Sequence, residues 1–214
     1  MLVGFFDRVF FNVAIFASIA GIIYFITKRS FKNRYHLVDK FLDDEMEANT
    51  ARRREVEEEY FYLPDIESLP VRNDAVGDVA KMQERALVCA RQKMLRFPQK
   101  MTNIELKNAY GVANLEKLTG YEENYNRYVM ALVNWADALL ESGEAKADAV
   151  AILKKTVEMG SEYRKTYLHL ADYYLEKSDI EGLNHLLEKV AELFSDEGIK
   201  RQVTQYIMDK REKL

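Results

Sequence analysis

Few side chains in the sequence have a type and spacing that could do chemistry. The candidate metal ligands and nucleophiles are His36, His169, His185 and Cys89. His169 and His185 fall on helices predicted to be partners, where Asp172 or Glu188 would have to complete a metal site. Histidines on helix surfaces are far commoner than histidine ligands, so we expect neither a metal nor another cofactor.

No pattern in the sequence predicts an enzyme. The glycine-rich phosphate-binding motifs and the His-Glu-x-x-His zinc motif do not occur in it. Cys89 lies between Val88 and Ala90 on an apolar stripe, which indicates a buried thiol rather than a nucleophile. The basic residues 52–54 are followed by acidic residues 57–59, and the net charge is −4, so we expect no nucleic-acid partner.

The elements that must position these residues are predicted to be helices. The chain of 214 residues has only 9 glycines and 3 prolines, and its apolar residues recur at helical spacing from Ala75 onward. We therefore predict an all-α fold in three parts. These are an anchor at residues 1–30, a charged helix and strap at residues 31–73, and a helical domain at residues 74–214.

The N-terminal part is predicted to be a transmembrane helix. The run from Val9 to Ile26 holds no acidic or basic side chain, and as a helix it would span about 27 Å, close to a bilayer core. A cleaved signal peptide, the main alternative, carries its basic residues before the apolar run. Here Lys28, Arg29, Lys32 and Arg34 follow it. The positive-inside rule then places the C-terminal domain of a single-pass protein in the cytoplasm.

Small residues in the apolar run favour contact with a second membrane helix. They are Ala14, Ala17, Ser18 and Gly21. Their spacing lets two helices approach closely. Small residues are also common in solitary membrane helices, so both alternatives stay open.

Residues 31–73 are predicted to contain a short helix followed by an extended segment. Val38, Phe41, Leu42 and Met46 have roughly helical spacing. Residues 60–73, called the strap below, begin with the aromatic run Tyr60–Tyr62 and contain two prolines. A free linker would seldom carry so much apolar surface, so we expect the strap to pack on the helical domain.

Capping and breaking residues predict where the later helices begin and end. Helices are expected over about 74–96, from Thr102 to Gly120, over about 122–142, and over about 196–214. Thr102 and Glu105 have the spacing of a capping box. Gly143 is expected to close the helix before it.

The last third of the chain contains an internal repeat. Trp135-Ala136-Asp137 recurs 35 positions later as Leu170-Ala171-Asp172, and a turn and a second helix follow each copy. With Tyr167 and Tyr174 this pattern resembles the tetratricopeptide repeat family. The resemblance implies an α-solenoid of stacked antiparallel helix pairs whose ligands lie along the concave face of the first helices. The small residues and the proline that the family favours in the second helix and between repeats are missing.

The resemblance also implies a binding face. Its candidate residues are Asn134, Asp137, Glu141, Lys165, Leu168, His169, Asp172 and Glu176. Lys165 is the one cation left where some family members clamp a carboxylate. The four acids would favour a neutral or basic, partly apolar segment, and solvated acids without a ligand are the alternative.

These features predict a membrane-anchored, non-enzymatic scaffold or adaptor that presents a helical surface to a cytoplasmic protein. The alternative is an accessory structural subunit of a multi-subunit membrane complex, with the anchor and residues 60–64 as its contacts. An enzyme with an unrecognised helical site is the least favoured hypothesis.

Overall fold

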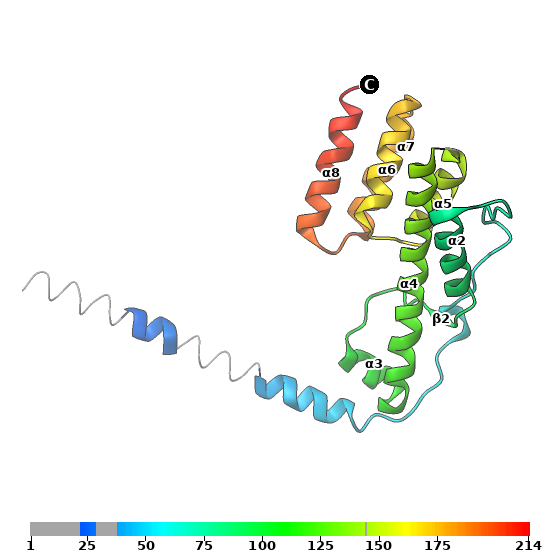
Figure 1. Cartoon of the computed structure of the whole chain (residues 1–214). Helices are drawn as coiled ribbons and strands as arrows, with labels where there is room; N and C mark the ends of the chain where they lie inside the picture. Colours follow the sequence, from blue (N-terminus) through cyan, green and yellow to red (C-terminus); the bar gives the residue numbers. More distant parts are fainter. Residues whose placement is uncertain (1–21, 29–37, 144) are drawn as a thin grey trace, which may run out of the picture. The chain divides into compact units, whose positions relative to one another are not determined.

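The computed structural model describes residues 22–28, 38–143 and 145–214 (Figure 1). Most of these residues are helical, and the only strands among them are two short ones. The all-α prediction is therefore confirmed. No helix within the described ranges is both long enough and apolar enough to cross a membrane. The predicted helix-packing residues Ala14, Ala17, Ser18 and Gly21 lie outside these ranges.

The chain divides into two compact units. One contains the chain up to Glu55 together with Lys100–Leu115, and the other contains Val56–Gln99 and Glu116–Leu214. The strap therefore folds with the helical domain, whereas residues 100–115 fold with the helix over residues 38–48. The sequence-based boundary after residue 73 instead runs between the members of both pairs.

In the first unit, helices cover residues 22–28 and 38–48 and α3 (Asn103–Tyr110). The predicted capping box at the start of α3 is confirmed. The Glu105 amide donates to the Thr102 hydroxyl at 3.3 Å, and the Thr102 amide donates to the Glu105 carboxylate at 2.7 Å. These two bonds satisfy backbone donors that have no partner inside the helix.

The helix predicted from Thr102 to Gly120 ends in the wrong place. Helix α3 ends before Gly111, where φ is 82°. The next helix, α4 (Val112–Ser142), is continuous and passes through Gly120. A Cβ at Gly111 would lie 2.8 Å from the Cα of Arg53, so this position needs glycine for both its conformation and its space. At Gly120 a Cβ would meet nothing within 4 Å. A glycine inside a long helix costs only about 1 kcal/mol, which is too little to end α4.

The second unit begins with a short 3-10 helix, η1 (Glu58–Tyr60), and a two-stranded sheet. Strand β1 (Phe61–Tyr62) pairs antiparallel with β2 (Met94–Leu95), and α2 (Gly77–Ala90) lies between them in sequence. The predicted helix over 74–96 is thus wrong at its end, because fully buried Met94 and Leu95 pair with the strap. The prediction that the strap packs on the helical domain is confirmed.

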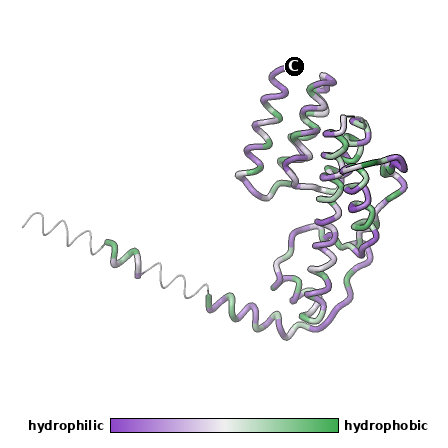
Figure 2. Tube along the Cα trace, in the orientation of Figure 1, coloured by the Kyte–Doolittle hydropathy of each residue, from purple (hydrophilic) through white to green (hydrophobic). Residues whose placement is uncertain are grey.

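The rest of the second unit is a succession of helices connected by short turns. They are α5 (Lys146–Glu158), α6 (Arg164–Glu176), α7 (Ile180–Leu193) and α8 (Glu197–Arg211). Helix α6 packs against α5, α7 and α8, and α7 also packs against α8 (Figure 1). Polar and apolar residues alternate along these helices, as amphipathic packing requires (Figure 2).

Large and small side chains alternate in the core of the second unit. Trp135 and Tyr167 are fully buried, and so are the small residues Ala136 and Ala171. Large and small residues of the internal repeat therefore both belong to this core. A small residue on one helix lets its neighbour approach, and an aromatic ring fills the space beside it.

Gly182 is a close-packing residue that the sequence comparison missed. A Cβ there would lie 2.5 Å from a ring carbon of Tyr174, so only glycine lets α7 approach α6 this closely. The repeat pattern placed the small residue at Leu183, one position later. Asp179 caps α7 by accepting a hydrogen bond from the Gly182 amide at 2.8 Å, which fixes the turn that brings the two helices together.

Candidate functional site

A hollow of about 180 Å³ lies among α4, α5 and α6. Its apolar side chains are Leu140, Val150, Leu153 and Tyr173. Its polar side chains are Lys146, His169, Asp172 and Glu176. Because Val150 and Leu153 are buried while Lys146 and Glu176 are exposed, the base of the hollow is apolar and its mouth is charged.

Helical spacing explains why α6 contributes four of these side chains. His169, Asp172, Tyr173 and Glu176 follow at positions i, i+3, i+4 and i+7, which lie on one face of a helix. The other face of α6 carries Leu170 and Tyr174, which are buried in the core. The same periodicity that packs α6 therefore presents a polar and aromatic face to the hollow.

Asp137 on α4 is held by two side chains of α6. Its Oδ2 lies 2.5 Å from the Nζ of Lys165, and its Oδ1 lies 3.0 Å from the Nε2 of His169. Partial burial raises the pKa of Asp137, but the hydrogen bonds and charges of Lys165 and His169 outweigh it and hold this pKa below its ordinary value. The carboxylate in turn raises the pKa of Lys165.

Asp172 on α6 is held in the same manner by α8. The Tyr206 hydroxyl lies 2.9 Å and 3.0 Å from the two carboxylate oxygens, and the Nζ of Lys210 lies 2.5 Å from Oδ1. The hydrogen bond to Asp172 is the main reason that the pKa of Lys210 is raised. In both clusters a carboxylate on one helix is bound by two residues four positions apart on a later helix. We call these two arrangements the carboxylate clamps.

Sequence reasoning missed Tyr206 and Lys210. Their spacing of four residues matches that of Lys165 and His169, and this match was the available signal. It could be recognised only once α8 was known to pack against α6 as a further helix of the series. The spacing alone is common in any helix.

Most of the predicted acids are already paired. Besides the two clamped carboxylates, Glu176 accepts a hydrogen bond from Lys146 at the mouth of the hollow. Each of the three acids thus has a cation beside it. The hollow is therefore less negative than the sequence implies, since two of the positive partners, Lys146 and Lys210, come from positions that sequence reasoning did not connect to it.

The predicted binding residues are only partly brought together. His169, Asp172 and Glu176 line the hollow, and Asp137 and Lys165 join it through His169. Asn134, Glu141 and Leu168 do not line it. Leu140, Lys146, Val150, Leu153 and Tyr173 line it as well and were not predicted.

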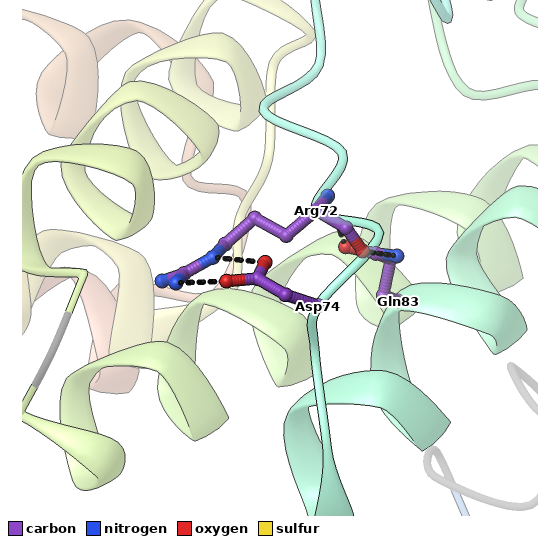
Figure 3. A network of polar contacts seen from close by, with 3 residues as sticks. All are labelled: Arg72, Asp74 and Gln83. Carbon is purple, nitrogen blue, oxygen red and sulfur yellow. Dashed lines mark hydrogen bonds and ion pairs between the residues drawn. The ribbon is translucent and has the colours of Figure 1, made fainter.

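The strap is fixed by side chains of the helical domain. The Gln83 amide side chain, which is almost fully buried, accepts from the Arg72 backbone amide and donates to the Arg72 carbonyl, both at 2.9 Å (Figure 3). Arg72 also pairs with Asp74 at 3.2 Å. Lys155 donates to the Asp65 carbonyl at 2.9 Å. These contacts close the strap against α2 and α5.

Aromatic side chains of the strap contact rings of α4. The Tyr62 ring lies 5.1 Å from the ring of Tyr125, and the Phe61 ring lies 6.2 Å from the ring of Tyr121. Leu63 is the large apolar side chain of the strap that points mostly to solvent, at 87% exposure. The rings of Phe61 and Tyr62 are therefore used mainly inside the second unit.

The two C-terminal histidines have different neighbours. His169 faces Asp137, and His185 lies 4.0 Å from Glu188. Among the residues that the structure describes, no group of three or more His, Cys, Asp or Glu side chains could hold a metal ion. The arrangement of the hollow instead suits the burial of an apolar side chain beneath paired charges. Comparison of the chain with protein-family models, with curated proteins and with solved structures yielded no match.

Proposed function

We propose that the protein is a membrane-anchored scaffold of tetratricopeptide-like helix pairs that binds a protein partner at the hollow among α4, α5 and α6. The observation that carries this proposal is the chemistry of the hollow. Its base is apolar, its mouth is charged, and the charges at the mouth are paired. Such a site binds an apolar side chain favourably and disfavours an isolated charge.

The repeated carboxylate clamps support the stacked arrangement of helix pairs. Asp137 and Asp172 occupy equivalent positions of the internal repeat, and each is bound by the second helix after its own: Asp137 on α4 by α6, and Asp172 on α6 by α8. Helix α8 thus occupies the position that the first helix of a third pair would have. Two equivalent contacts between successive first helices are expected when each pair is placed on the next by the same rotation.

The exposed side chains of residues 22–28 support the membrane anchor. Five consecutive large apolar residues, Ile22 to Ile26, are each more than half exposed. The Thr27 hydroxyl donates to the Ile23 carbonyl at 2.8 Å, so it has a partner inside its own helix, as a hydrocarbon environment requires. The basic residues that follow favour a cytoplasmic position for the helical domain.

The partner chemistry follows from the same contacts. The acids that favoured a basic ligand in the sequence are clamped, so the net attraction for cations is small. We infer an uncharged or weakly basic segment that inserts one apolar side chain against Leu140 and Tyr173. Tethering at the bilayer would raise the local concentration of such a partner.

Site-specific photocrosslinking of the full chain in its native membranes tests the proposal. A photoreactive amino acid replaces Tyr173 in the hollow or, as the control, Tyr163, which is also partly exposed but does not line the hollow. We expect one defined crosslinked protein at position 173 and not at position 163. Leu140→Glu in the hollow should abolish that product, whereas Val88→Glu on the exposed surface of α2 should not. An identical product pattern at both positions would refute the proposal.

The alternative function, an accessory subunit of a membrane complex, depends mainly on the anchor. Phe61 and Tyr62, which we expected to contact other subunits, pack against rings of the second unit, and Leu63 is the exposed apolar residue that stays open to such a contact. Substitution of Ala17 and Gly21 by leucine should release the protein from such a complex. Unchanged co-purification after these substitutions would remove this alternative.

A further inference from the structure

The helix over residues 38–48 carries an apolar stripe that no other described residue covers. Val38, Phe41, Leu42 and Met46 are 48, 54, 52 and 70% exposed. Their positions i, i+3, i+4 and i+8 lie along one side of the helix. Among the charged residues, Asp39 and Asp43 flank the stripe, and Lys40 and Glu47 lie on the opposite side. The helix is therefore amphipathic, with its apolar side open.

The end of this helix is attached to its own unit. Ala48 is fully buried, and Glu45 lies 2.5 Å from the Nζ of Lys107 on α3. The stripe itself begins two turns earlier and stays exposed. Glu45 follows Val38 by seven residues and lies on the same side of the helix, so α3 meets this side near its C-terminal end. The four side chains of the stripe nevertheless stay about half exposed or more, in a surface held in a defined place in the unit.

Charge and area argue against a protein as the occupant. In a pair of identical helices, the acidic residues Asp39 and Asp43 beside the stripe would face their own copies, and like charges repel. The stripe has only four large side chains. A stable interface needs about 800 Å² from each partner, far more than this short helix offers.

The position of the stripe in the chain favours a bilayer. Val38 follows the last residue of the apolar run, Ile26, by 12 residues. Even fully extended, that length reaches no more than about 40 Å at ~3.4 Å per residue. An anchor in the membrane therefore keeps the stripe near the lipid surface. Its contact with lipid is then an intramolecular step at high effective concentration.

We propose that residues 38–48 lie on the bilayer surface as an amphipathic helix, with Val38, Phe41, Leu42 and Met46 at the boundary of headgroups and acyl chains. The acidic side faces water, where its charges keep their hydration. The proposal rests on the membrane anchor of the proposed function. It adds a second membrane contact that belongs to the folded part of the chain.

Depth-dependent fluorescence quenching of the full chain tests the proposal. The protein is reconstituted in phosphatidylcholine vesicles whose acyl chains carry bromine, and two single variants are compared. Phe41→Trp places an indole in the stripe, and Lys40→Trp places it on the opposite side. The native Trp135 is fully buried and common to both variants. We expect bromine to quench the Phe41→Trp variant at least about twofold more than the Lys40→Trp variant.

The outcomes separate this inference from the anchor. Flotation of the chain with the vesicles reports the anchor alone, so loss of flotation would overturn both proposals. Flotation with equal quenching in the two variants would overturn only the surface helix. Protection of the Phe41→Trp variant from aqueous iodide without quenching by bromine would also overturn it, because the stripe would then be covered by a second copy. Circular dichroism checks that both variants keep their helix content.

Discussion

Substitution of Gly182 by alanine should destabilise the second unit, whereas the same substitution at Gly120 should stabilise it. Both glycines lie inside helices with ordinary helical φ. They differ in their surroundings. An added Cβ meets nothing within 4 Å at Gly120, but at Gly182 it would lie 2.5 to 2.8 Å from three ring carbons of Tyr174.

The expected magnitudes follow from these distances. Replacing glycine by alanine in a helix interior gains at most about 1 kcal/mol. At Gly120 nothing opposes this gain. At Gly182 the Tyr174 ring must move, and overpacking costs typically about 1–3 kcal/mol. The ring has little freedom because Tyr174 is only 8% exposed and its ring lies 5.6 Å from that of Tyr173. We expect a net loss of about 1–2 kcal/mol for Gly182→Ala.

Urea unfolding followed by circular dichroism measures both changes in the full chain. A double-mutant cycle with Tyr174→Ala isolates the contact, because in that background Gly182→Ala should no longer destabilise. Equal or greater stability of Gly182→Ala in the native background would refute the reasoning. It would mean that the approach of α6 and α7 is not limited at this position.

Three further predictions follow from individual side chains. Tyr125→Phe removes a buried hydroxyl that donates to a backbone carbonyl, so it should lower the free energy of unfolding by about 1 kcal/mol and with it the melting temperature. Tyr128→Phe removes a hydroxyl without a hydrogen-bond partner among the described residues and should be neutral or stabilising. The lowered pKa of Asp137 means that its contribution to stability is present above the unfolded-state pKa, near 4, and is lost as the pH falls through the folded-state pKa. Urea midpoints of wild type and Asp137→Asn should therefore differ at pH 6, begin to approach each other near pH 4, and converge only below the lowered folded-state pKa. Gln83→Ala breaks both hydrogen bonds to the strap backbone and should speed tryptic cleavage there, whereas Glu84→Ala, at an exposed position, should leave the cleavage rate unchanged; equal rates would show that Gln83 does not hold the strap.

The helices and several of their ends could be read from the sequence because their causes are local. The Thr102–Glu105 capping box needs only four consecutive residues, and Gly143 ends α4 through its own backbone conformation. The burial of Trp135 and Ala171 follows from periodicity within one helix. Each signal lies within a window that a single helix turn or two can contain.

Other features were decided only by contacts between segments far apart in sequence. Position 111 requires glycine because its φ is positive and the backbone of Arg53 lies against it, and no local pattern distinguishes Gly111 from Gly120. The helix after residue 74 stops at Ala90, and Met94 and Leu95, which the prediction placed in that helix, pair with the strap instead.

The hollow and its charges were also decided by contacts between segments far apart in sequence. Lys146 and Lys210 neutralise acids of the hollow from other helices, so the sequence alone overestimated its negative charge. Ion pairs and close approaches act over a few ångströms, and only the packing of the helices determines which side chains come within that distance.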